Sequence, residues 1–261
     1  MIRPVGSAHG DDTRWIANVG ALARSIGPAM DAIGGLNIAQ VSVLLADIAY
    51  SGEGGDGVHG VADGRNPTTR SVASECRVVI YKIGGAPVTA EEFLFTYAHE
   101  LFHCIQHKTW FSRSAYLRAA TWWVEGSAEY FANLVKPDAN FSAENIAEFD
   151  TKSLKTSMAD LDYANVVPFF WLAQDGGPSA VRTLLQAMPD AEGRDAQLTA
   201  LRTRWPLERW LRFGEAYFDG RITRPGGRRL ARPSQMLDGV TVRRSVRVPL
   251  TVDAAYALAR R

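Results

Sequence analysis

The spacing of apolar residues changes along the chain. Before residue 89, short runs rich in Val, Ile and Leu at 40–45 and 77–83 predict strands. After residue 89, apolar residues recur mainly every three or four positions, which predicts helices. We expect one helix near the start of the chain, at 12–32, and another that begins after Thr89. Further helices are expected at about 118–135, 163–174, 179–188, 195–204 and 207–219.

The helix that follows Thr89 has the clearest signals. Thr89-Ala-Glu-Glu92 fits a capping box, in which a threonine hydroxyl and a glutamate three residues later satisfy free backbone N–H groups. Phe93, Leu101 and Ile105 then supply apolar faces at helical spacing. We therefore expect a well-defined helix through about residue 105.

Half of the residues in the segment 51–60 are glycine. The segment lacks the Gly-Lys-Ser/Thr ending of a phosphate-binding loop, so nucleotide binding is not expected. Residues 51–64 are predicted to form either a lid over a cleft or an ordinary surface loop.

The segment 221–261 is strongly basic. It carries ten arginines and two aspartates, and the rest of the chain holds 19 basic and 26 acidic groups. Its arginines lack interleaved aromatic residues, so binding to nucleic acid is not expected. Alternating valines at 240–250 predict short strands, which either pack on the preceding helices or begin a further domain.

Overall composition is that of an ordinary globular protein. The 261 residues are 46% hydrophobic and 22% charged, with a net charge of +1, which excludes a disordered chain. No apolar run reaches the roughly 18 residues of a membrane span. The first residues contain no apolar segment typical of a secretory signal, and compartment and oligomeric state stay open. Cys76 and Cys104 permit either one disulfide or two buried thiols.

The sequence His99-Glu100-Leu-Phe-His103 falls inside the well-capped helix. Four residues of helical rise place the two imidazoles about 6 Å apart along one face, where both can reach a single zinc ion. Glu100 is rotated by about 100° from His99, which suits proton transfer from a metal-held water better than ligation. His107 lies a further turn away and is expected to pack or to support a ligand.

A second constellation is Trp122-Trp-Val-Glu125-Gly-Ser-Ala-Glu129-Tyr-Phe131. Bare carboxylates among aromatic residues are costly unless they are paired or bind a metal. We therefore favour Glu125 as a third ligand, with Glu129, one turn along the same face, reaching the free ring nitrogen of a ligand histidine. The alternative is a solvated stripe of carboxylates.

These two segments together resemble the gluzincins, zinc peptidases with HExxH on one helix and a glutamate ligand on the next. The Glu-Gly-x-Ala-Glu-Tyr-Phe form is similar to the ligand helix of bacterial collagenases and of HExxH aminopeptidases. The resemblance spans about residues 75–220. It implies that His99, His103 and Glu125 hold Zn²⁺. It also implies that Glu100 is the general base and that Glu129 lies behind the ligands, next to a ligand histidine. A metzincin would need Gly and His where this chain has Gln106 and Thr109, so that group is excluded.

The resemblance also implies an α+β fold. We expect a zincin-like catalytic domain over residues 1–220, with a small N-terminal sheet within about 35–88 and a mainly helical lobe over about 89–220. Residues 221–261 would form a basic, β-containing tail or the start of another domain.

The expected activity is zinc-dependent hydrolysis of peptide bonds in a peptide or protein substrate. Related enzymes place a tyrosine after the glutamate ligand, which makes Tyr163 the first candidate for the oxyanion donor, with Tyr130 and His107 as others. A Gly-x-Met-Glu-Asn segment, which holds the substrate's amino terminus in the aminopeptidases, is absent, so endopeptidase action is favoured. The alternatives are an aminopeptidase, and a binding module whose zinc or empty HExxH site joins two helices.

Overall fold

The structure is a computed structural model that describes residues 2–4, 24–34, 41–46, 60–65, 72–81, 89–109, 121–153, 156–188 and 193–233. The chain forms two compact units. Unit 1 comprises Met1–Leu117 and Phe131–Phe141, and unit 2 comprises Arg118–Tyr130 and Ser142–Arg261.

Unit 1 contains a four-stranded arrangement at the backbone level, formed by β1 (Ile2–Pro4), β2 (Val41–Ala46), β3 (Gly60–Arg65) and β4 (Val72–Tyr81). The strand order is β1-β2-β4-β3, with β1 and β4 parallel to β2 and with β3 antiparallel to β4. The two predicted β-rich runs correspond to β2 and β4. The end of the predicted glycine-rich loop or lid is instead strand β3, and residues 51–59 lie outside the described residues.

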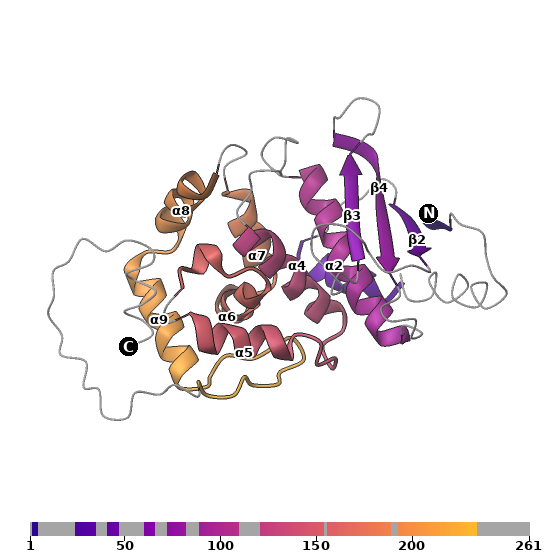
Figure 1. The fold of residues 1–261 in the computed structure, drawn as a ribbon. Helices are drawn as coiled ribbons and strands as arrows, with labels where there is room; N and C mark the ends of the chain where they lie inside the picture. Colours follow the sequence, from indigo (N-terminus) through magenta and orange to yellow (C-terminus); the bar gives the residue numbers. More distant parts are fainter. Residues whose placement is uncertain are drawn as a thin grey trace, which may run out of the picture. The chain divides into compact units, whose positions relative to one another are not determined.

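Helix α2 (Ala90–Thr109) lies against β3 and β4 (Figure 1). It begins as the capping box predicts, because the backbone N–H of Glu92 donates to the Thr89 hydroxyl at 3.1 Å. Val78 and Ile80, two residues apart on β4, are both buried, as are the apolar residues of α2 from Phe93 to Ile105. Phe102 of α2 stacks on Phe131 with ring centroids 5.0 Å apart.

The predicted α+β fold class is wrong for the part of the chain whose side chains the structure describes. That part is 72% helical and contains no complete strand, so it is a mainly helical fold and not an α+β domain with an N-terminal sheet. The physical reason is that the strands contribute only Val78 and Ile80 to the described core, whereas helices supply most of the rest. Runs of Val, Ile and Leu identify strand-forming backbone, but they do not show which elements build the core.

Unit 2 is made of helices joined by short connections. The predicted helices are confirmed within a few residues, except that 163–165 form a 3₁₀ turn and residues 143–152 form a helix that the sequence did not predict. The elements are α4 (Thr121–Val135, whose last residues belong to unit 1), α5 (Ala143–Lys152), η2 (Met158–Asp160), η3 (Tyr163–Asn165), α6 (Val166–Gly176), α7 (Ser179–Gln186), α8 (Gly193–Arg204) and α9 (Leu207–Phe218).

An aromatic cluster holds unit 2 together. Trp205 packs edge to face on Trp171 and Trp210, with ring centroids 5.3 and 4.6 Å apart, and Phe213 contacts all three rings. Arg209 lies over both Trp171 and Trp205 and pairs with Asp175 at 3.0 Å. Aromatic rings bury large apolar areas, so this cluster is a major source of stability for α6 and α9.

The first part of the basic tail belongs to unit 2. Thr223 and Arg229 form an isolated antiparallel bridge, and Ile222 and Leu230 are buried. Residues 221–233 therefore pack on the helical body. The strands predicted at 240–250 lie outside the described residues, as do residues 12–22 of the predicted first helix, of which 24–32 are helical.

Within the described ranges, no helix is both long and apolar enough to cross a membrane.

Candidate metal centre

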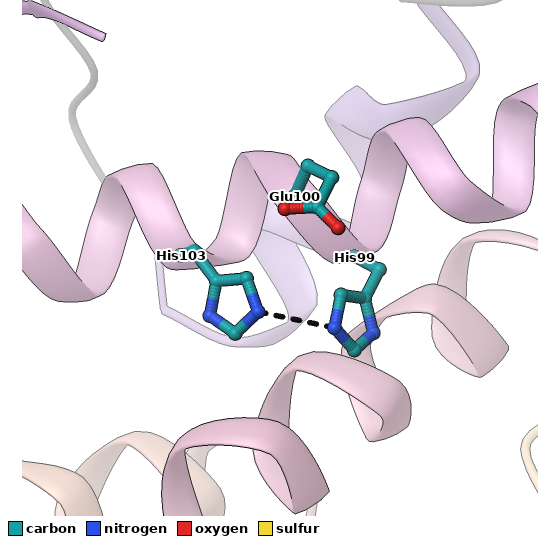
Figure 2. A group of neighbouring side chains, drawn as sticks. All are labelled: His99, Glu100 and His103. Atoms are coloured by element: carbon teal, nitrogen blue, oxygen red, sulfur yellow. Dashed lines mark hydrogen bonds between the residues drawn. The ribbon is translucent and has the colours of Figure 1, made fainter. Parts of the chain in front are cut away.

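Three buried side chains of α2 form a group that could hold a metal ion. His99, Glu100 and His103 are 6%, 6% and 5% exposed, and their potential ligand atoms all lie within 4.8 Å of one another. The two imidazoles project from the same side of the helix because four residues make about one turn (Figure 2). The helix backbone therefore places the three groups together without help from another element.

The two histidine rings meet through their Nε2 atoms, which are 3.1 Å apart. The rings cross at 79°, with centroids 4.8 Å apart. Two nitrogens bound to one tetrahedral zinc at about 2.0–2.1 Å lie about 3.3 Å from each other. The observed separation is close to that value, so the pair fits a metal ion with little rearrangement.

Gln106 supports His103 from the next turn of α2. Its side-chain oxygen lies 2.8 Å from Nδ1 of His103, and Gln106 is fully buried. In the sequence, Gln106 served only as evidence against a metzincin, and its contact with His103 was not predicted. The signal was the spacing, because side chains three residues apart on a helix are neighbours.

Cys104 is disulfide-bonded, so the alternative of two buried thiols is wrong. The chain's other cysteine is Cys76. A sulfur held in a disulfide is not a thiolate, so Cys104 does not serve as a metal ligand here. The side chain of His107 lies outside the described residues.

The predicted third ligand belongs to unit 2, on the first part of α4. Glu125 is half-buried and Glu129 is 4% exposed. Convergence of these carboxylates with the histidines of unit 1 therefore stays a prediction.

Glu129 has partners within its own unit. Its Oε1 accepts hydrogen bonds from the hydroxyl of Ser142 at 2.6 Å and from the side-chain amide of Asn145 at 2.9 Å. Burial and the neighbouring Arg228 lower the pKa of Arg224, and the charge of Glu129 acts in the opposite direction. Glu129 is thus a buried, hydrogen-bonded carboxylate that ties α4 to α5. Ser142 and Asn145 were missed because their distance from Glu129 in sequence gives no local signal.

Gly126, directly after Glu125, is explained by packing. A Cβ built on it would lie 3.0 Å from Cβ of Asn165 and 3.0 Å from a ring carbon of Phe169. A glycine here allows the segment leading into α6 to approach the helix that carries both glutamates.

The candidate oxyanion donors differ in exposure. Tyr163 is 44% exposed, so its side chain is not part of the core. Thr121 donates a hydrogen bond to the neighbouring Asp162, which anchors this turn to the start of α4. Tyr130 is 1% exposed, packs edge to face on Phe170, and has a pKa raised by burial.

Comparison with known proteins finds no matching family model, no matching curated protein and no matching solved structure.

Proposed function

We propose that this protein is a zinc-dependent peptidase, with endopeptidase action favoured. The observation that carries the proposal is the approach of the His99 and His103 Nε2 atoms to 3.1 Å, next to the buried carboxylate of Glu100. Two imidazoles and a carboxylate are common donors for zinc, although imidazole also suits copper, iron and nickel. The short motif accounts for these three groups without a contribution from unit 2.

The burial of the group supports a functional role. Three titratable side chains, each at least 94% buried on one helix, impose a large desolvation cost unless they are paired or bind an ion. The Nε2 atoms of the two imidazoles face each other at 3.1 Å, so the nitrogens that could bind a cation point to the same place. Metal binding therefore explains why both histidines are placed together in the core.

Glu125 is proposed as the third ligand, on the sequence resemblance alone. With three protein ligands, a tetrahedral ion keeps one position for water, whereas closed structural zinc sites usually have four protein ligands. His99, His103 and Glu125 would supply three ligands, and Glu100 would be a further acid, so a catalytic site is favoured over the binding module. Glu129, already held by Ser142 and Asn145, would fix the position of α4 rather than act on substrate.

Glu100 is proposed as the general base. Bound zinc would supply Lewis acidity that lowers the pKa of a water to about 7. Glu100 would accept the proton as that water attacks the peptide carbonyl carbon, and would then deliver it to the leaving amine. Tyr163, exposed on unit 2, would donate its hydroxyl proton in a hydrogen bond to the developing oxyanion.

Substitution of the base and of a ligand separates these roles. Glu100→Gln should retain zinc and lower the turnover of a quenched peptide library by about 10²–10⁴-fold. His99→Ala should lose the metal. Glu92→Gln is the matched control, because it makes the same chemical change on the same helix outside the group.

The outcomes distinguish the alternatives. Zinc in equal molar amount, with no cleavage of any peptide by the wild type, would favour the binding module. Release of only amino-terminal residues would favour an aminopeptidase. Equal loss of zinc in Glu100→Gln and His99→Ala would contradict the role of Glu100 as base.

A further inference from the structure

Gln106 is placed to control the chemistry of His103 without reaching an ion itself. Its side-chain oxygen lies 2.8 Å from His103 Nδ1, on the side of the ring opposite to Nε2. Neither side chain has room to exchange this contact freely for water, because Gln106 is fully buried and His103 is 5% exposed. Both residues lie on α2, so the contact is set by a single rigid element.

This contact determines which ring nitrogen carries the proton. A glutamine side-chain oxygen only accepts hydrogen bonds, so the Nδ1 of His103 must donate. In the neutral imidazole the lone pair is then on Nε2, the atom that faces Nε2 of His99 at 3.1 Å. The nitrogen available for a cation is the one that points toward the other histidine.

We propose that Gln106 is a positioning residue, which holds His103 in the Nδ1-protonated tautomer and aims its Nε2 at a divalent cation shared with His99. The proposal rests on the proposed function only in requiring a cation at these two histidines, and it does not require peptidase activity. Outer partners of ligand histidines fix the ring orientation and typically change metal affinity by about 10–100-fold. Gln106 supplies a neutral acceptor for this purpose, in contrast to the carboxylate that Glu129 was expected to provide.

Two substitutions of Gln106 and one matched control test this role. Gln106→Leu removes the acceptor and keeps a similar volume, whereas Gln106→Glu retains an acceptor oxygen. Gln197→Leu is the control, because Gln197 is also buried and its side-chain oxygen accepts a hydrogen bond from Trp123 Nε1 at 2.9 Å in unit 2. Each full-length variant is titrated with zinc against a chromophoric chelator, and His103 is observed by ¹⁵N NMR in the zinc-free protein.

Gln106→Leu should bind zinc about 10–100-fold more weakly than the wild type. Gln106→Glu should restore the affinity to the wild-type level or above, and Gln197→Leu should leave it unchanged even where it lowers thermal stability. The NMR spectrum should show protonated Nδ1 at His103 in the wild type and a mixture of tautomers in Gln106→Leu. If Gln106→Leu does not fold, the wild-type spectrum and Gln106→Glu still decide the matter.

Failure of this role is distinguishable from failure of the proposed function. Wild-type zinc affinity in Gln106→Leu, a wild-type His103 protonated at Nε2, or weak binding by Gln106→Glu would overturn the positioning role alone. A wild type that binds no zinc would overturn both. A wild type that binds zinc through His103 and cleaves no peptide would leave the role of Gln106 standing and remove the peptidase.

Discussion

Replacing Ser142 by alanine tests whether the hydrogen bonds of Glu129 hold α4 and α5 together in unit 2. The Ser142 hydroxyl is fully buried and donates to Glu129 Oε1 at 2.6 Å. Ser142 also occupies the N-cap position of α5, yet its side chain makes no capping hydrogen bond there. The substitution therefore removes one hydrogen bond to a buried carboxylate and leaves the cap chemistry nearly unchanged.

The expected cost follows from the charge and burial of the acceptor. A hydrogen bond to a charged group contributes about 1.5–3 kcal/mol, and water does not readily replace it at a carboxylate that is 4% exposed. For a chain of this size, about 1 kcal/mol shifts the melting temperature by about 2–4 °C. Ser142→Ala should therefore lower the melting temperature by about 5–10 °C.

Ser153→Ala is a matched control. The Ser153 hydroxyl is also buried, but it has no hydrogen-bond partner among the described residues. Its removal should cost nothing or should stabilise the fold, because an unsatisfied polar group is exchanged for an apolar one. Both variants are compared by thermal and urea unfolding. Equal melting temperatures for Ser142→Ala and wild type, or an equal loss in both variants, would refute the role assigned to Glu129.

Three further predictions concern packing, ionisation and metal binding. Gly126→Ala should cost about 1–3 kcal/mol in urea unfolding, because its Cβ would lie 3.0 Å from Asn165 and Phe169; an unchanged midpoint would contradict this close approach. Burial raises the pKa of Tyr97 from 10.0 to about 12, so the unfolded chain releases this proton first. The contribution of Tyr97 to the free energy of unfolding should be fully present below pH 10 and should be lost as the pH rises toward 12. In Tyr97→Phe the decrease in the free energy of unfolding over this range should be smaller by about 2–3 kcal/mol. Zinc at about 100 times its dissociation constant should raise the melting temperature by about 5–10 °C, and a similar rise in His103→Ala would count against this site.

Local signals were sufficient for the helix that carries the metal group. The Thr89 cap and the apolar periodicity defined α2, and the spacing of His99 and His103 fixed their common face. All of this information lies within about one or two turns of one element. The contact from Gln106 to His103 follows the same helical geometry and was available from the sequence.

Features that depend on tertiary contacts were missed. Helix α5 was not predicted, and the partners of Glu129 lie 13 and 16 residues away. The α+β class failed for a related reason, since strand-like composition at 40–45 and 77–83 did not show that helices would supply most of the described core. The convergence of Glu125 with the two histidines is likewise a long-range property, and it stays a prediction.

X-ray absorption at the zinc edge of the zinc-loaded wild type tests the central claim most directly. The account predicts two imidazole ligands at about 2.0–2.1 Å, completed by oxygen and with no sulfur at about 2.3 Å. His103→Ala, treated with the same amount of zinc, should retain little of it and should give no spectrum with two imidazole ligands. A wild type that retains no zinc, or whose zinc has no imidazole ligands, would contradict the claim that His99 and His103 form a metal centre.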